Sequence, residues 1–259
     1  MIARPPPGTR AIARAVRLLT ALGTRKNIGW RLTDLAAQCE LDDSTTHRIM
    51  TCLTLLRLAQ QRKSDRRYIP GPMLFELALS LPAYPVFQRD CHAILLQLVK
   101  VTGWNTFMYL RSGEESVCID RIGASTLAQP LIDIGSRRLL AGSSMGIAML
   151  LAMPKEERLA ILAANRERLD QVAAHRKRGY ELMWMRSMEK GMGFSLGDVL
   201  PGGGSIAVAI LDTNRQPFAA IGVSGPLDAF TPDRIDAVTA MLQEEARRIE
   251  VEQTELINP

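Results

Sequence analysis

The chain has 259 residues and a formal net charge of +5, and 47% of its residues are hydrophobic and 23% charged. These values are close to the average of soluble globular proteins, and they exclude disordered, collagen-like and coiled-coil classes. No apolar stretch approaches the roughly 20 residues of a membrane span, and the Pro-rich start lacks the apolar segment of a secretory signal. At roughly 100–200 residues per domain, the length predicts one large domain or two ordinary ones.

The cysteines, histidines and glycines give no catalytic, metal-binding or cofactor pattern. The cysteines lie far apart without a CxxC pair, which is neither a disulfide framework nor a zinc motif and which suits a reducing cytoplasm: Cys39, Cys52, Cys91 and Cys118. The three histidines stand in separate segments. Gly202–Gly204 lacks the Lys of a phosphate loop and the spacing of a dinucleotide fold. We therefore expect no enzyme activity, no metal and no cofactor.

The charge is unevenly spread along the chain. Residues 1–67 hold thirteen basic and five acidic side chains, a net charge of +8, whereas residues 68–259 carry −3. A compact basic unit joined to a slightly acidic larger unit is typical of a polyanion-binding module with a partner domain. Chance clustering on a solvated surface is the alternative, so the charge needs a fold signal beside it.

Three helices are predicted in the basic segment. Apolar residues at helical spacing indicate a helix over 10–22, which we expect Gly23 to end. Thr33 is a good N-cap for a second, short helix over 34–39. Asp42 and Asp43 can cap a third helix that runs to about Leu56.

The third helix has one apolar and one polar face. Ile49, Leu53 and Leu56 recur at i, i+4 and i+7 and are expected to form the buried stripe. The opposite face carries Ser44, His47, Thr51 and Thr54, with Arg48 at its edge. The two strands of a hairpin, 59–62 and 68–69, follow with a basic tip between them. Three helices and a basic hairpin describe a winged helix-turn-helix.

The second helix of a helix-turn-helix presents short polar and basic groups to base edges in the major groove. Arginine suits guanine or phosphate, hydroxyls suit phosphate or base edges, and wing arginines suit phosphates or the minor groove. We predict these DNA-binding residues: Thr33, Ser44, Thr45, Thr46, His47, Arg48, Thr51, Arg66 and Arg67. An ordinary solvated helix face is the alternative for the helix, and a solvated turn is the alternative for the wing.

The rest of the chain mixes helices and strands and predicts an α+β domain. A helix over 71–81 leads into a linker marked by Pro82 and Pro85. Further helices are predicted over 85–101, 143–153 and 154–163, with one ending near 175–179 and a last one over 232–253. Strands are predicted over 106–111, 116–122, 205–212 and 218–224, and turns over 191–204.

Over roughly residues 10–253 the chain resembles the IclR-type transcriptional regulators. The N-terminal marks of the resemblance are Arg14–Leu19, Leu32–Ala36, Ser44–Ile49 and Tyr68–Gly71. The C-terminal marks are Gly135–Arg137, Ser143–Ala148, Arg178–Tyr180, Ser205–Val208 and Ser224–Pro226. Each fragment is weak alone, and their order and spacing together are specific.

The resemblance implies a multi-domain protein. It implies a winged helix-turn-helix over 8–70, with the helix-turn-helix at about 32–53, a linker helix over 71–84 and a GAF-like α+β domain with an antiparallel sheet over 85–254. It further implies double-stranded operator DNA, a second copy of the chain in a dimer or tetramer, and a small organic effector, often an aromatic or carboxylic acid. No membrane partner is expected.

The resemblance also places an effector pocket. Carried over residue by residue, it consists of Leu140, Gly142, Ser143, Met145, Asp198, Ser205 and Ser224. Backbone N–H groups at the helix start after Gly142 could bind an anion. The chain departs from the family pattern at Ile147, where a Lys is usual, at Ala209, where a Pro is usual, and at Arg57, where a Gly is usual.

The sequence thus predicts a cytoplasmic, ligand-responsive DNA-binding regulator without catalytic activity. One alternative is a small-molecule sensor or enzyme whose DNA-binding module is vestigial. Another is an architectural nucleic-acid binder, whose affinity would follow salt but not sequence.

Overall fold

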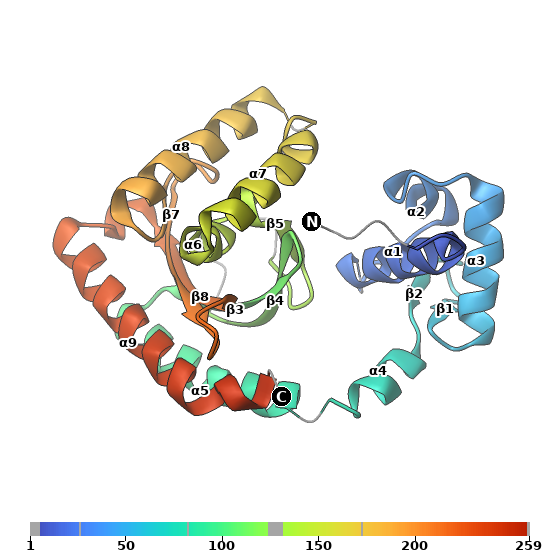
Figure 1. Ribbon diagram of the computed structural model, residues 1–259, viewed down its shortest axis with the longest axis horizontal. Helices are drawn as coiled ribbons and strands as arrows, with labels where there is room; N and C mark the ends of the chain where they lie inside the picture. The colour runs from blue at the N-terminus through green and yellow to red at the C-terminus, as the bar shows by residue number, and fades with distance from the viewer. Residues whose placement is uncertain (1–5, 26, 82, 124–131, 172, 258–259) are drawn as a thin grey trace. The chain divides into compact units, whose positions relative to one another are not determined.

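The computed structural model describes residues 6–25, 27–81, 83–123, 132–171 and 173–257 (Figure 1). Contacts within the chain divide it between residues 82 and 83 into two compact units, and each is described by itself. The smaller, N-terminal unit contains the predicted winged helix-turn-helix. The larger unit is an α+β domain, as the sequence predicted.

The N-terminal unit has four helices and a two-stranded hairpin in its described part. Its elements are α1 (Arg10–Thr24), α2 (Leu32–Gln38), α3 (Asp43–Leu55), β1 (Ala59–Gln61), β2 (Tyr68–Pro70) and α4 (Pro72–Ala78). The strands β1 and β2 pair antiparallel. The carboxylate of Asp42 accepts a hydrogen bond from the Thr45 N–H at 2.7 Å, so the predicted N-cap of α3 is confirmed. The hairpin is the predicted wing.

A small apolar core holds the three helices and the hairpin together. Leu18, Leu22, Leu35 and Met50 are fully buried in it. Trp30 joins the helices to the wing, because its indole N–H donates to the Ala21 carbonyl at 2.9 Å and its backbone pairs with that of Tyr68. The wing is therefore part of the folded unit and not a free loop.

Three local predictions in this unit were wrong. Gly23 lies inside α1, which runs on to Thr24, and Thr33 is the second residue of α2 and caps nothing. Leu56 is 55% exposed, because α3 ends at Leu55 and the buried stripe is Thr46, Met50 and Leu53. The stripe is thus offset from the expected one.

The C-terminal unit is built on one six-stranded antiparallel sheet. The strand order is β5-β4-β3-β8-β7-β6. The strands are β3 (Asn105–Ser112), β4 (Glu115–Ile122), β5 (Arg137–Leu139), β6 (Gly193–Leu196), β7 (Gly203–Leu211) and β8 (Pro217–Pro226). The longest pairing joins β7 and β8, the two strands that carry Ser205 and Ser224.

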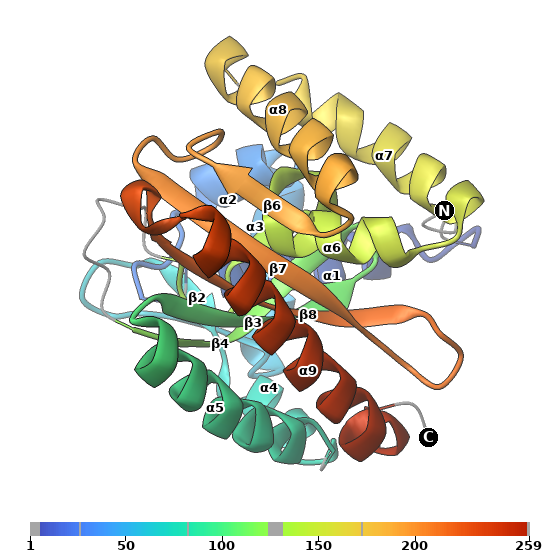
Figure 2. The same cartoon turned by 90° about the vertical axis from the view of Figure 1, so that its left-hand side faces the viewer.

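Helices cover both faces of this sheet. Two helices, α5 (Ala83–Thr102) and α9 (Pro232–Ile257), lie side by side over one face (Figure 2). The other face is covered by α6 (Ser144–Ala152) and α8 (Ala174–Lys190), with α7 (Lys155–Leu169) packed beside the short helix η1 (Leu140–Gly142). A second short helix, η2 (Leu227–Ala229), precedes α9. Each face has its own apolar core.

Two predictions in the C-terminal unit were wrong, and one short strand was missed. A helix was expected to end near Gly179, but α8 begins at Ala174 and carries Gly179 in its interior. Gly179 is there for close packing, because a Cβ atom would lie 2.1 Å from the Asp198 carbonyl oxygen. The strand β6 falls in the segment predicted as turns, and β5, which is three residues long, was not predicted at all.

Two glycine substitutions in the N-terminal unit test this description, because they should change its stability in opposite directions. Gly23→Ala should stabilise the unit by about 0.5–1 kcal/mol, because Gly23 is inside a helix and a Cβ there meets no atom within 4 Å. Gly71→Ala should destabilise it by about 1–3 kcal/mol, because the new Cβ would lie 2.2 Å from the Arg57 carbonyl oxygen. Hydrogen exchange of the α1 and α3 amides in each variant measures both changes. A loss of protection in Gly23→Ala would contradict the helix end at Thr24.

Candidate functional site

The exposed face of α3 carries most of the polar residues that the sequence singled out. Ser44, His47, Arg48 and Thr51 are exposed there. Their spacing places them on the first two turns of α3, which the Asp42 cap fixes at its start. No carboxylate in the described residues pairs with the guanidinium of Arg48. This face can therefore contact a polyanion without first breaking an internal ion pair.

Three other predicted DNA-binding threonines differ in position. Thr33 is exposed on α2 and Thr45 is half-buried on α3. Thr46 is fully buried in the core of the unit, and its hydroxyl has no hydrogen-bond partner among the described residues. Thr46 cannot reach DNA from that position, so its assignment as a contact residue is corrected. Thr46 stands three residues before Ile49 and seven before Leu53, a spacing that puts it on the buried side of α3.

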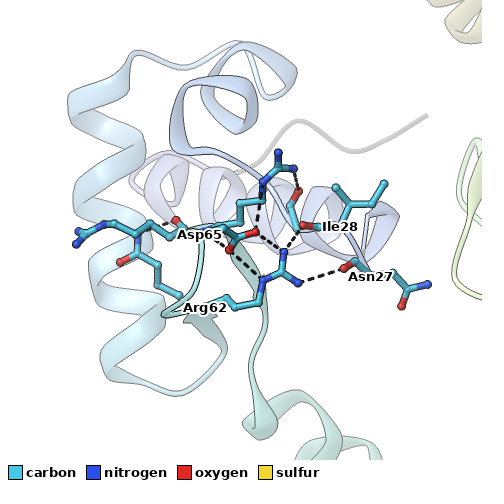
Figure 3. Close-up of polar contacts among 8 residues, drawn as sticks. Asn27, Ile28, Arg62 and Asp65 are labelled. Atoms are coloured by element: carbon cyan, nitrogen blue, oxygen red, sulfur yellow. Dashed lines mark hydrogen bonds and ion pairs between the residues drawn. The ribbon is translucent and has the colours of Figure 1, made fainter.

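Arg62 fixes the wing to the loop before α2 (Figure 3). Its guanidinium donates to the carbonyl oxygens of Asn27 at 3.2 Å and Ile28 at 2.6 Å. The same group makes a bidentate pair with Asp65, with N–O distances of 3.0 and 2.6 Å. The pairing with Arg62 lowers the pKa of Asp65 to about 2. Arg62 thus binds Asp65 within the wing and, at the same time, two backbone carbonyls of the loop before α2.

Arg67, which the sequence predicted as a DNA contact of the wing, makes contacts within the protein. Its guanidinium donates to the Gly29 carbonyl at 3.3 Å and lies 3.6 Å from the Asp65 carboxylate. Lys63 and Arg66 are exposed, and no described carboxylate pairs with either side chain. The structure therefore presents Lys63, which was not predicted, and Arg66 as the free cations of the wing. Arg67 braces it.

A cavity of about 380 Å³ lies between the sheet and the helices α6 and α8 of the C-terminal unit. The expected residues Gly142, Ser143, Met145, Ser205 and Ser224 line it. These residues come from η1, α6 and the strands β7 and β8, which are far apart in the sequence and meet only in the fold.

Two expected pocket residues do not line the cavity. Leu140 is fully buried in the apolar core below α6. The carboxylate of Asp198 is 3.1 Å from the Arg186 guanidinium and accepts the Leu196 N–H at 3.0 Å. Asp198 therefore stabilises the turn after β6. The residue that follows it, Val199, does line the cavity.

A row of serine hydroxyls crosses one side of the cavity. Ser195 on β6 lies opposite Ser205 on β7, which lies opposite Ser224 on β8. The Ser205 hydroxyl donates to that of Ser144 at 2.9 Å. The Ser224 hydroxyl is buried and has no partner in the described residues, and an unpaired buried hydroxyl costs free energy that a ligand could recover. Ser195 and Ser144 were missed because their place depends on the pairing of β6 and on the exact start of α6.

The N-terminus of α6 faces the same cavity. Ser143 is its N-cap, and the Ser143 hydroxyl accepts the Gly146 N–H at 3.1 Å. The N–H groups of Ser144 and Met145, the first two helical residues, have no carbonyl acceptor within the helix. Such N–H groups, together with the helix dipole, favour an anion.

The cavity also contains two arginines that sequence reasoning missed. Arg138 on β5 and Arg176 on α8 both line it, and the described lining residues include no Asp or Glu. Phe107 and Tyr109 supply aromatic surface, and burial raises the pKa of the Tyr109 hydroxyl, which keeps it neutral. The arrangement can hold a small molecule that is negatively charged and has an apolar body.

Two cysteines of the C-terminal unit, Cys91 and Cys118, are buried. Burial raises the pKa of the Cys91 and Cys118 thiols to about 12, so both remain protonated near neutral pH. Protonated thiols are poor nucleophiles. No group of three or more metal-ligating side chains gathers in the described part of the chain. No helix among the described residues could cross a membrane.

Comparison with known proteins gives a consistent result. The family profile "IclR helix-turn-helix domain" matches residues 11–63, and "Bacterial transcriptional regulator IclR C-terminal" matches residues 86–251. The chain is 26% identical over 255 residues to the transcriptional repressor IclR of Escherichia coli strain K12, with 93% of this chain and 88% of the relative covered.

Solved structures show the same fold. An IclR-family regulator from Brucella abortus is similar with a TM-score of 0.72 and 22% identity, covering 93% of this chain and 91% of the other. An IclR homologue from Microbacterium hydrocarbonoxydans, complexed with 4-hydroxybenzoate, is similar with a TM-score of 0.67 and 18% identity, covering 93% of this chain and 98% of the other.

The wing pair predicts a pH-dependent stability. Asp65→Asn should destabilise the N-terminal unit at pH 7, because it removes the bidentate partner of Arg62. The pKa of Asp65 is about 2 in the folded state, against roughly 3.9 for an unpaired carboxyl. Folding therefore gains from this group above pH 4, and the gain is lost as the pH falls through about 2.

Thermal unfolding of the wild type and Asp65→Asn between pH 2 and 7 measures this dependence. The difference between the two proteins should shrink towards pH 2. Asp34→Asn, at an exposed position on α2, is the control and should show no such convergence. If the stability difference between wild type and Asp65→Asn were the same at pH 2 and pH 7, the low pKa assigned to Asp65 would be wrong.

The buried hydroxyl of Thr46 gives a second prediction. Thr46→Val replaces an unpaired buried hydroxyl by a methyl group of the same shape, so it should stabilise the unit by about 1 kcal/mol. Thr51→Val is the matched control, because the exposed Thr51 hydroxyl already donates to the His47 carbonyl. Denaturant unfolding of the three proteins measures the effect, and a destabilised Thr46→Val would show that the hydroxyl has a partner.

Proposed function

Because the chain belongs to the IclR family of bacterial transcriptional regulators, we propose that it binds an operator through α3 and the wing, and that an organic acid in the cavity changes this affinity. The protein is a ligand-responsive DNA-binding regulator, as its relatives are repressors of the same two-part architecture. We assign residues 8–70 to the DNA-binding domain, 71–84 to a linker and 85–254 to the effector-binding domain.

The single observation that carries the DNA-binding proposal is the exposed polar face of α3 in a unit of high positive charge. Residues 1–67 have a net charge of +8. The side chains of Ser44, His47, Arg48 and Thr51 can enter the major groove with the first turns of α3, where arginine recognises guanine best. Lys63 and Arg66 can contact phosphates beside the groove. We assign Thr33 and Thr45 to contacts with the backbone of the same duplex.

The cavity supports the second half of the proposal. Its volume is in the range of small-molecule sites, and its α6 N-terminus, serine row and arginines favour a carboxylate. The 4-hydroxybenzoate complex of a homologue of the same fold supports an organic acid as the ligand. An effector shifts operator affinity only by the difference in its own affinity for the two states of the regulator.

Exposed apolar side chains support a second copy of the chain as partner. Ile12 and Val16 on α1 are 65% and 56% exposed, and Phe75 and Leu77 on α4 are 69% and 56% exposed. Apolar surface of this kind marks interaction sites. A two-fold dimer would also match the two half-sites of a palindromic operator. The protein would act in the cytoplasm, where it meets the chromosome, and as a regulator without turnover of its ligand.

A mobility-shift titration tests the DNA-binding proposal. The protein is titrated against the DNA upstream of its own gene and against a scrambled duplex, at two salt concentrations. We expect the native duplex to bind at least about 1000-fold more tightly. Arg48→Ala should weaken this binding by about 1–3 kcal/mol, and Arg166→Ala, at an exposed position on α7, should not change it.

The other outcomes select the alternatives. Equal, salt-sensitive binding to both duplexes would favour an architectural nucleic-acid binder. Binding to neither duplex, together with turnover of a bound ligand, would favour a sensor or enzyme with a vestigial DNA-binding module. A folded Arg48→Ala protein of unchanged affinity would remove Arg48 from the interface.

A further inference from the structure

The two arginines of the cavity differ from their neighbours in having no carboxylate partner. In the same unit Arg137 and Arg168 both pair with Glu115, at 2.7 and 2.8 Å, and other arginines pair with Glu157 and Asp198. Among the described residues, no ion pair or hydrogen bond neutralises the guanidinium of Arg138 or Arg176. The cavity therefore has an excess of two positive charges.

The arginines are not the only anion-binding feature of the cavity. The α6 N-terminus and the serine row form another, and there the buried Ser224 hydroxyl, with 8% of the residue exposed, lacks a partner. A carboxylate at this place would accept hydrogen bonds from Ser224 and from the free N–H groups of α6. A single carboxylate bound there leaves the arginines without a counter-charge.

Strand register separates Arg138 from the serine row. Ser224 on β8 lies opposite Asn105, at the start of β3. Arg138 on β5 lies opposite Ser116, which lies opposite Arg111 near the end of β3. Arg138 and Ser224 thus belong to opposite ends of β3. Apolar lining from Phe107 and Met145 completes the wall of the same cavity.

We propose that the cavity recognises an organic dianion, with one carboxylate at the α6 N-terminus and the serine row and a second carboxylate on Arg138 and Arg176. The inference deepens the proposed function, on which it rests, by fixing the charge class of the effector. The two arginines act as specificity determinants. They bind the second carboxylate of a dianion, whereas the apolar end of a monocarboxylate accepts no hydrogen bond from them.

Calorimetric titration of the full-length protein with matched acids tests the proposal. Succinate, adipate, suberate and terephthalate are each compared with the monocarboxylate of the same chain or ring: butyrate, hexanoate, octanoate and benzoate. At the length that fits, the dicarboxylate should bind about tenfold to a hundredfold more tightly than its partner, the range of a charge-assisted hydrogen bond.

Variants assign this preference to the arginines. Arg138→Gln and Arg176→Gln should each reduce the ratio between the two acids towards one, because the dicarboxylate loses more affinity than the monocarboxylate. Arg138→Lys keeps a cation and should keep part of the ratio, which separates a charge effect from a packing defect. Arg178→Gln, an exposed position of α8 outside the cavity, is the matched control and should retain the full ratio.

Three results would overturn the proposal. They are equal affinities within every pair of acids, a dicarboxylate preference that survives both glutamine variants, and no binding of any dicarboxylate at millimolar concentration. These results leave the proposed function standing if the operator is still bound specifically in the mobility shift, or if a monocarboxylate alters that binding. The loss of specific operator binding, by contrast, would count against the proposed function alone.

Discussion

The close approach of α6 to the sheet is the constraint on which the cavity depends. A Cβ atom on Gly193 would lie 1.9 Å from the Ser144 carbonyl oxygen, and one on Gly222 would lie 2.5 Å from the Met145 side chain. Glycine at position 193 lets the backbone at the start of α6 rest directly against β6, and glycine at position 222 leaves room for the Met145 side chain against β8. The free N–H groups of the helix are thereby brought to the serine row. Without that contact, the sheet would present hydroxyls and the helix would present a dipole, but not to the same ligand.

Both units divide their arginines between structure and recognition by pairing some and leaving others unpaired. In the wing, Arg62 and Arg67 are held by Asp65 and backbone carbonyls, which fixes the hairpin and leaves Arg66 at its surface. In the C-terminal unit, Arg137 pairs with Glu115 while its neighbour Arg138 lines the cavity. The residue type alone does not distinguish these roles. The roles differ according to whether a carboxylate lies close enough to pair with the arginine, and the fold determines this.

The sequence predicted most elements but only part of each site. Helical spacing and the Asp42 cap located α3, and the basic tip located the wing, because these signals are local. Thr46 was misplaced because the whole run from Ser44 to Arg48 was assigned to DNA contact, although its spacing from Leu53 puts Thr46 on the buried face. Of the residues that the family resemblance places in the pocket, Ser205 and Ser224 line the cavity, whereas Asp198 holds a turn through Arg186. Arg138 was missed because β5 has three residues, too few for a periodic pattern, and its place in the cavity follows from pairing with β4.

The DNA-binding face and the cavity, the two proposed anion sites, attract their ligands over different distances. Residues 1–67 carry +8, and their exposed cations create a field that can steer DNA over about a Debye length, roughly 8 Å at physiological salt. Residues 68–259 carry −3, so the unit with the cavity does not attract anions by its net charge. Its anion preference must come from groups that line the cavity. A polymer cannot enter a space of about 380 Å³, and a small acid gains little from an exposed helix face. Operator DNA and effector thus need not compete, although both are anions.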